Sequence, residues 1–365
     1  MDDIIKKAGF WDIYQKVLAN ERLSIEDGRL LYQSNEILAM GYMANIVRER
    51  KNGHNTYFIY NQHLNYSNIC TNLCKFCAFG RERGDALAYE MSVEEVREKI
   101  SQRINEPIVE IHMVGGIHPD LPFDYYLEVL RAIKEIRPAV HIQAFTCVEI
   151  AHLAQLKGDS IENTLTVLVE AGLGSVPGGG AEVFSTRIRE MTCADKLSGK
   201  DWLEIAQTIH RSGLRSNATM LYGHLETIDE RLEHLDALRL AQDQTNGFLA
   251  FIPLAFHPKN TALDSLAGTT GFDDLKNIAI SRLFLDNFPH IKAYWVMLGP
   301  KIAQLALTFG ADDMDGTVKE EIITHMAGAE TDTTIGSETL IRLIKEAGRI
   351  PVERGTLYDV IEVHD

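Results

Sequence analysis

Long uncharged hydrophobic runs are absent from this 365-residue chain. None reaches the roughly 18 consecutive apolar residues that a membrane-spanning helix needs. The N-terminal residues, Met-Asp-Asp-Ile-Ile-Lys-Lys, lack the apolar core of a secretory signal peptide. The sequence therefore predicts no membrane span and no export, and we expect a cytoplasmic protein.

Basic charge is also scarce, with 36 Lys and Arg against 52 Asp and Glu, a formal net charge of −16. A nucleic-acid-binding protein needs a basic face, and an anionic membrane surface attracts basic segments. We therefore expect neither kind of partner. The chain has no short internal repeat and no low-complexity tract, and its 45% hydrophobic content is enough for a large core.

Cysteine is rare too, and five cysteines in a chain of this length do not make a disulfide framework. Three of them, Cys70, Cys74 and Cys77, nevertheless fall within eight residues as C-x3-C-x2-C. Three thiolates can hold three irons of a [4Fe–4S] cluster and leave the fourth open, whereas ordinary electron-transfer clusters use four cysteines. Zinc is the alternative, although structural zinc usually has two separated ligand pairs. Cys147 and Cys193 are isolated, and we interpret both as buried thiols.

Strand-like and helix-like segments alternate after residue 55, which favours a parallel α/β fold. We expect strands at 63–68, 108–114, 140–145, 172–176, 216–221, 248–252 and 291–296, and a weak one near residue 311. Helices are predicted at 92–104, 123–136, 200–211, 228–244, 273–287 and 300–309. This pattern predicts a (β/α)8-like TIM barrel over 56–317, with an N-terminal helical extension (1–55) and a C-terminal helical segment (318–365) packed on the barrel. In such barrels the loops after the strands form the site, and the cysteine loop follows the first expected strand.

Glycines and charged residues follow three further strands. Gly115 and Gly116 follow the second, and their lack of a side chain lets the backbone approach a ligand. Glu149 follows the third, where a carboxylate can bind an amine or a ribose hydroxyl; a helix-start carboxylate is the structural alternative. Arg189, beyond a glycine-rich stretch at 177–180, is a cation able to fix a carboxylate, unless it forms an ordinary surface ion pair.

The loops after the fifth and sixth strands carry further candidates. His224 and Glu226 form a polar pair that could donate, accept or orient a proton. The 251–261 stretch contains two prolines and two aromatics. It predicts a stiff apolar wall of the kind a small aromatic substrate needs, or a packing loop.

The cysteine spacing resembles the signature of the radical S-adenosylmethionine (SAM) superfamily. This resemblance implies one [4Fe–4S] cluster per chain, with SAM bound as co-substrate at the open iron and cleaved by one electron to a 5′-deoxyadenosyl radical. The aromatic ring of Phe76, between two of the ligands, could pack against the adenine of SAM, or it could serve the structural packing of the cysteine loop. Gly115 and Gly116 correspond to the family's GGE motif, whose backbone receives the amino group of SAM, with Ile117 in place of the glutamate. The 220–227 stretch resembles the family's G-x-I-x-G-x-x-E region.

Longer stretches, at 63–68, 77–79, 177–182, 220–227, 251–261, 288–295 and 351–358, resemble the aminofutalosine synthase family of the futalosine route to menaquinone. The resemblance implies addition of the adenosyl radical to the vinyl carbon of 3-[(1-carboxyvinyl)oxy]benzoate, aryl migration and loss of the carboxylate. The products would be 6-amino-6-deoxyfutalosine, methionine and bicarbonate. The nearest alternative is the hydrogen-abstracting cyclic dehypoxanthine futalosine synthase group, in which Trp is usual where this chain has Leu254. A non-catalytic iron–sulfur or zinc-binding protein is the third reading.

The implied reaction sets requirements for side chains and partners. The two carboxylates of the substrate need cations or donors, for which the sequence offers Arg83, His118, His224 and Arg189. Tyr66, Asn65 and Glu226 are further predicted contacts, and we expect catalytic roles for His224, Glu226, Arg83 and Tyr66. The partners implied are the small-molecule substrate and a flavodoxin- or ferredoxin-type electron donor.

Overall fold

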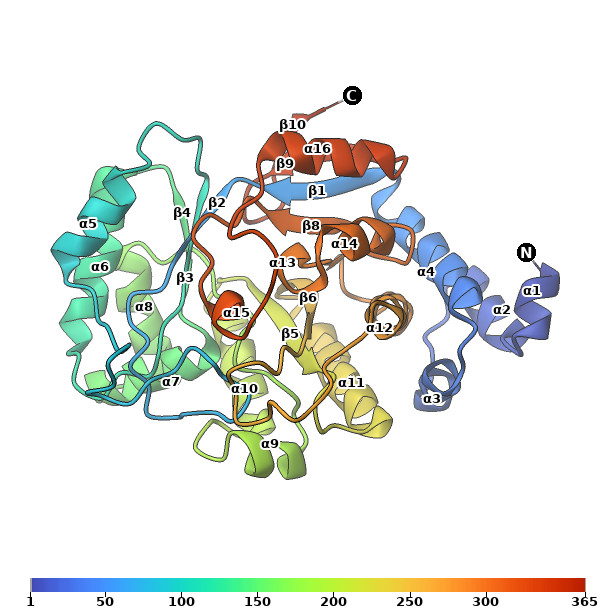
Figure 1. The fold of residues 1–365 in the computed structure, drawn as a ribbon, viewed down its shortest axis with the longest axis horizontal. Helices are drawn as coiled ribbons and strands as arrows, with labels where there is room; N and C mark the ends of the chain where they lie inside the picture. The colour runs from blue at the N-terminus through green and yellow to red at the C-terminus, as the bar shows by residue number, and fades with distance from the viewer. Residues whose placement is uncertain (1, 365) are drawn as a thin grey trace.

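The structure is a computed structural model that describes residues 2–364 (Figure 1). Four helices come first, namely α1 (Asp2–Lys7), α2 (Trp11–Ala19), α3 (Ile25–Gln33) and α4 (Ile37–Asn52). Helix α4 packs against α12, and α3 packs against α11 and α12, so this group covers one side of the domain. The boundary at residue 55 between an extension and the barrel stays a prediction.

Parallel strands form the centre of the fold. They are β1 (Asn55–Ile59), β2 (Asn61–Leu64), β3 (Glu110–Met113), β4 (His141–Ala144), β5 (Ser216–Tyr222), β6 (Phe248–Ala255), β7 (His290–Ile291) and β8 (Asp313–Gly316). Two of the sheets have the orders β2-β3-β4 and β5-β6-β7, and β1 pairs with β8. Single parallel bridges join β4 to Ser175, Val176 to β5, Lys292 to β8 and Gln62 to Lys319. The ladders and bridges together connect the strands into a ring, which confirms the (β/α)8-like barrel.

Tyr60 alone separates β1 from β2, and helices occupy the connections between the later strands of the ring. They are α5 (Val93–Ser101), α6 (Phe123–Ile136), α7 (Cys147–Lys157), α8 (Ile161–Ala171), α9 (Thr186–Thr192), α10 (Gly199–Arg211), α11 (Ile228–Thr245), α12 (Gly271–Phe284), α13 (Trp295–Leu298) and α14 (Pro300–Ala306). Capping boxes at Ser92, Thr146 and Thr227 start α5, α7 and α11. Each satisfies two backbone N–H groups that a helix start leaves unpaired. These starts lie just beyond the loops that follow β2, β4 and β5.

The C-terminal segment departs from the expectation of helices alone. It contains α15 (Ile323–Met326) and α16 (Ser337–Glu346), and also β9 (Ile350–Arg354) and β10 (Val360–Val363). Strand β9 pairs in parallel with β1, and β10 pairs antiparallel with β9. Pro351 lies inside β9, and a proline argues against a strand when only the sequence is read. The strand forms because one edge of β1 is free to pair with β9. The neighbouring strand β2 offers no such edge, since it pairs with β3.

Three predicted strands differ from the observed ones. The first was expected at 63–68, but β1 and β2 lie earlier, and residues 65–68 already belong to the cysteine loop. Of 172–176, only Ser175 and Val176 make bridges. The seventh ends at Ile291, and Trp295 begins α13 and donates its indole N–H to Gly316 O at 2.8 Å. That tertiary bond overrides the strand propensity of an aromatic residue. Within residues 2–364, no helix combines the length and apolarity that crossing a membrane requires.

Candidate functional site

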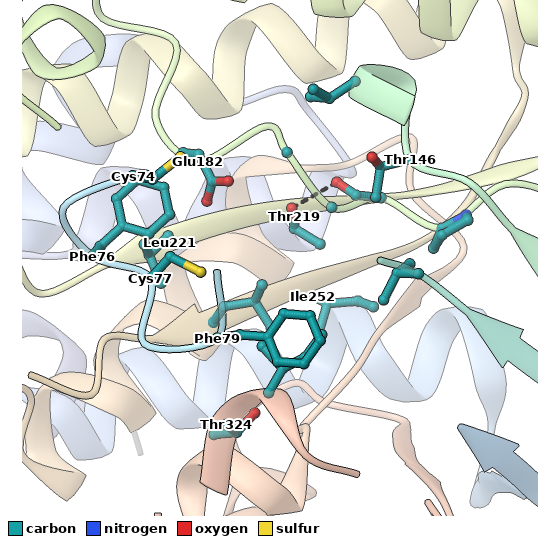
Figure 2. A pocket seen from close by; sticks show the side chains of 18 of the residues that line it. Cys74, Phe76, Cys77, Phe79, Thr146, Glu182, Thr219, Leu221, Ile252 and Thr324 are labelled. Carbon is teal, nitrogen blue, oxygen red and sulfur yellow. Dashed lines mark hydrogen bonds between the residues drawn. The ribbon is translucent and has the colours of Figure 1, made fainter. Parts of the chain in front are cut away.

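A cavity of about 340 Å³ lies inside the barrel and opens at the C-terminal ends of its strands (Figure 2). Its lining runs from the cysteine loop after β2 to Glu110, the first residue of β3. The cavity therefore has a mouth beside the cysteines and a floor deep in the ring of strands. This is the end of the barrel at which such folds build their sites.

Cys70, Cys74 and Cys77 all line this cavity. Figure 2 shows Cys74, Phe76 and Cys77 together on one side of it, with Glu182 beside them. The backbone N–H of Gly80 donates to Cys77 Sγ at 3.3 Å. Burial raises the pKa of the Cys74 thiol to about 12. The thiolate form at neutral pH therefore requires a bound metal, which deprotonates a coordinating thiol.

The other two cysteines do not line the cavity. Cys147 is the first residue of α7 and is buried, as predicted. Cys193 is buried behind the cysteine loop, where the preceding Thr192 O accepts the N–H of Lys75 at 2.8 Å. The donor set that faces the cavity therefore consists of three thiols. It fits an iron–sulfur cluster with one coordination position open to the cavity.

Gly115 and Gly116 line the cavity directly below the cysteine loop. A Cβ on Gly116 would lie 2.9 Å from Cys70 Cβ and closer still to the carbonyl of Ile69. A Cβ on Gly115 would lie 2.5 Å from the Tyr66 ring. The two glycines are therefore required by packing against the cysteine loop. Their backbone contact with a ligand stays a prediction.

Glu149 organises the same region. Its carboxylate lines the cavity and accepts hydrogen bonds from Tyr66 Oη at 2.9 Å, Gly115 N at 3.0 Å and Thr146 N at 2.7 Å. Burial raises the pKa of Glu149, although these donors oppose the shift. Tyr66 does not itself line the cavity. Its hydroxyl supports Glu149 from behind, which is a positioning role and not the substrate contact expected from the sequence.

Two of the predicted cations do not reach the cavity. Arg83 is exposed and pairs with Asp120. Arg189 is buried, and its guanidinium donates to Leu197 O at 2.7 Å and Ala181 O at 2.8 Å. These bonds fix the backbone around the glycine-rich stretch. The sequence placed Arg189 correctly after the fourth strand segment. It could not show that nearby backbone carbonyls would accept the hydrogen bonds of the guanidinium.

The His224–Glu226 pair lies beside the cavity and not in it. His224 Nε2 is 3.1 Å from Leu221 O, and the Glu226 carboxylate accepts from the backbone N–H groups of Gly223 and His224 and from Arg231. Glu226 therefore closes the loop after β5. His118 is likewise absent from the lining, so none of the four cations and donors nominated for the substrate carboxylates lies there. The catalytic roles of His224, Glu226, Arg83 and Tyr66 stay predictions that this geometry does not favour.

The sequence reading missed a set of polar side chains that point into the barrel. They sit within the strands or at their ends, and they line the cavity: His63, His112, Gln143, Asn217, Thr219, Lys292 and Asp315. His63, His112 and Gln143 are direct cross-strand neighbours. The two imidazoles stack with ring centroids 4.6 Å apart. Burial lowers the pKa of His63 well below its usual range, so that its ring is neutral. The available signal was that the buried strands β2, β3 and β4 each carry polar residues.

Lys196 and Glu182 are a second pair that was missed. Both line the cavity near the cysteines, and Lys196 Nζ donates to Glu182 Oε1 at 2.6 Å. The same ammonium lies 5.3 Å from the centroid of the Phe76 ring. Burial opposes its charge, but Cys74 and Glu182 together raise the pKa of Lys196. The pair brings a fixed positive charge to the wall beside the sulfurs.

Sequence comparisons identify relatives over almost the whole chain. The radical SAM superfamily profile matches residues 64–238, and that of the CofH/MqnC C-terminal region matches residues 245–365. An aminodeoxyfutalosine synthase from Thermus thermophilus is 47% identical, covering 97% of this chain and 96% of the relative. One from Streptomyces coelicolor is 41% identical, with 97% and 94% covered. A cyclic dehypoxanthine futalosine synthase from Halalkalibacterium halodurans follows at 38%, with 97% and 95% covered.

A comparison with solved structures agrees on the fold. The crystal structure of methylornithine synthase (PylB) superposes with a TM-score of 0.72 at 18% identity, covering 93% of this chain and 97% of that one. At this identity the match is evidence for the fold alone. The three cysteines lie inside the matched superfamily region and line the barrel cavity, as the superfamily's SAM and iron–sulfur chemistry requires. The chain therefore belongs to the radical SAM superfamily and, within it, to the family of the aminodeoxyfutalosine synthases.

Proposed function

We propose that this chain is an aminodeoxyfutalosine synthase. It would join the 5′-deoxyadenosyl group of SAM to 3-[(1-carboxyvinyl)oxy]benzoate, with aryl migration and loss of a carboxylate as bicarbonate. The near-full-length similarity to aminodeoxyfutalosine synthases carries this proposal, because it spans both the superfamily region and the C-terminal region. Leu254 adds support, since it lines the cavity at the position where the cyclase group usually has Trp.

Cys70, Cys74 and Cys77 would hold one [4Fe–4S] cluster per chain. When bound, the cluster supplies the single electron that splits SAM into methionine and the 5′-deoxyadenosyl radical. The glycine turn after β3 lies against the cysteine loop, close enough for its backbone to receive the amino group of SAM. Phe76 and Glu149 also line the cavity and are proposed SAM neighbours, whereas the carbonyl partners of Arg189 leave it little capacity for the carboxylate.

The cavity walls suit a carbon radical. Apolar side chains from β5, β6 and the segments around them line it, among them Leu221, Ile252, Leu254, Phe256 and Met297. Such a lining excludes water and groups that would quench a radical. The reacting carbons must meet at roughly 3–3.5 Å. The rigid strands that carry these side chains hold the substrate ring in that position.

An external protein must deliver the electron, and we propose a flavodoxin- or ferredoxin-type donor. Leu73 and Lys75 are exposed on the cysteine loop between the ligands. A lysine there favours an acidic donor by electrostatic attraction. Three free thiols at an open cavity also call for a reducing compartment, and we propose the cytoplasm.

Anaerobic turnover of the reconstituted enzyme tests the function. The enzyme is mixed with SAM, dithionite and 3-[(1-carboxyvinyl)oxy]benzoate, and the products are identified by mass spectrometry. An adduct that retains the adenine and ribose of SAM is expected, with bicarbonate released in equal amount. Free 5′-deoxyadenosine without an adduct would contradict the proposal and point to a hydrogen-abstracting relative. Three or fewer irons per chain together with no SAM cleavage would point to a non-catalytic metal-binding protein.

A further inference from the structure

We propose that Lys292, at the floor of the barrel cavity, binds the benzoate carboxylate of the acceptor substrate. This inference rests on the proposed function and adds a specificity-determining residue to it. Lys292 directly follows β7, where its backbone N–H donates to Phe251 O at 2.9 Å and it bridges to Asp313. Its side chain lines the cavity although the residue is only 6% exposed.

The ammonium of Lys292 has unused donors. Its closest charged partner, Asp315 Oδ2, lies 3.6 Å away, which is beyond hydrogen-bond length. No hydrogen bond from Nζ to any residue between 2 and 364 is present. An ammonium carries three donors and no acceptor, and a buried charge without hydrogen bonds is costly. An anion bound in the cavity would therefore accept the hydrogen bonds that the Lys292 ammonium does not make within the protein.

The other basic groups that line the cavity are already engaged. Lys196 donates to Glu182 at 2.6 Å. His63 is neutral because burial lowers its pKa, and His257 Nε2 is 3.0 Å from Met297 O. His112, the remaining histidine of the lining, has its Nδ1 3.2 Å from Gln143 Oε1. Of the two lysines among the described residues that line the cavity, Lys292 is therefore the one without a hydrogen bond from its ammonium. The proposed substrate is a dianion, so it needs such a group.

The position of Lys292 selects one of the two substrate carboxylates. Lys292 bridges to Asp313, the first residue of β8, and Glu110 is the first residue of β3, so both lie at the level of strand starts, at the end of the barrel away from the cysteine loop. The vinyl carbon has to meet the 5′ carbon of SAM at the mouth. The enol ether and its carboxylate therefore face the cysteines. The carboxylate on the ring points to the floor, towards Lys292.

Equilibrium binding to the reconstituted enzyme with SAM, in the absence of a reductant, tests this assignment. The two probes each keep one carboxylate: 3-(vinyloxy)benzoate keeps the one on the ring, and 2-phenoxyacrylate keeps the one on the enol ether. Lys292→Met should weaken 3-(vinyloxy)benzoate by about 30-fold or more, as expected when one partner of a buried charge pair is truncated. Binding of 2-phenoxyacrylate should change by less than about threefold, since it does not use Lys292. Lys200→Met, on the exposed face of α10, is the matched control and should leave both unchanged.

The inference is overturned if Lys292→Met weakens both probes equally, weakens neither, or weakens only 2-phenoxyacrylate. A measurement on the unaltered enzyme covers the case in which the variant does not fold. There, 3-(vinyloxy)benzamide should bind at least about 30-fold more weakly than 3-(vinyloxy)benzoate, and equal affinity would reject a cation at the floor. If the wild-type enzyme forms no adduct from the full substrate, the proposed function fails. Adduct formation with unchanged Lys292→Met binding rejects only the present inference.

Discussion

Replacing Gly116 by alanine should disrupt the iron site without touching a ligand. The added Cβ would lie 2.7 Å from the carbonyl carbon of Ile69 and 2.9 Å from Cys70 Cβ. Carbon atoms pack best at 3.5–4.0 Å, so the cysteine loop must move away by about 1 Å. Metal–ligand distances tolerate only about 0.2 Å. The displacement therefore exceeds what the coordination of Cys70 can absorb.

The loop cannot move without breaking backbone hydrogen bonds. Gly116 N donates to Ser67 O at 2.9 Å, and Thr71 N donates to Ile117 O at 3.0 Å, so the same displacement breaks bonds on both sides of the contact. Overpacking typically costs about 1–3 kcal/mol, and each lost hydrogen bond adds about 1 kcal/mol. We expect the free energy of unfolding of Gly116→Ala to fall by about 3–5 kcal/mol.

Iron and sulfide content after anaerobic reconstitution, together with thermal unfolding, is the assay for this variant. Gly80→Ala is the matched control, because its Cβ would lie 3.5 Å from Cys70 Cβ and 3.8 Å from Cys77 Sγ, which is ordinary contact. It should reconstitute like the wild type. The reasoning is refuted if Gly116→Ala binds as much iron as Gly80→Ala and unfolds at the same temperature.

Three further predictions concern the cysteines, a buried arginine and a buried histidine. Cys74→Ala should lose both iron and SAM cleavage, because it removes one of three cluster ligands. Cys193→Ser, whose thiol does not line the cavity, should keep roughly four-fifths or more of the iron. Equal iron content in the two variants would contradict the three-ligand assignment. Arg189→Met should lower the free energy of unfolding by about 2–4 kcal/mol, because it leaves buried carbonyls unpaired. The KM for SAM of the folded enzyme should not change. A raised KM with unchanged stability would instead show that Arg189 binds the carboxylate of SAM. Burial lowers the pKa of His210 to about 4, so the unfolded chain takes up this proton first and stability falls as the pH drops from 6.5 towards 4, by about 3 kcal/mol in total. Urea unfolding of His210→Gln should show a shallower fall over that range, and an identical slope would contradict the assignment.

The cysteine motif and the alternation of strands and helices were readable from the sequence because both are local. A C-x3-C-x2-C spacing places three thiols in one loop whatever the rest of the chain does. Amphipathic helices such as α6 and α10 show their apolar periodicity along the chain, and the capping boxes mark where several helices begin. These signals were sufficient for the barrel and the superfamily, and they place the three thiols in one loop; their role as metal ligands stays a prediction.

The direction of individual side chains was not readable, and this explains why several of the candidate residues do not line the cavity. A charged residue after a strand can face the cavity, the solvent or a neighbouring carbonyl. Arg83 faces solvent, Arg189 binds local carbonyls, and Glu226 closes its own loop. Each satisfies its polar atoms within a few contacts that only the folded chain provides. Buried polar groups must find such partners, and the sequence does not name the partner.

The sequence by itself determined the alternation of strands and helices, the three thiols in one loop and the family to which the chain belongs. Only the tertiary structure decided which polar groups share the interior. His63, His112 and Lys292 are far apart along the chain, and nothing in their local sequence marks them as neighbours. Closing the ring of strands turns these side chains to one inner face. The physical reason is that inward direction depends on strand register, and register is set by pairing between segments distant in sequence.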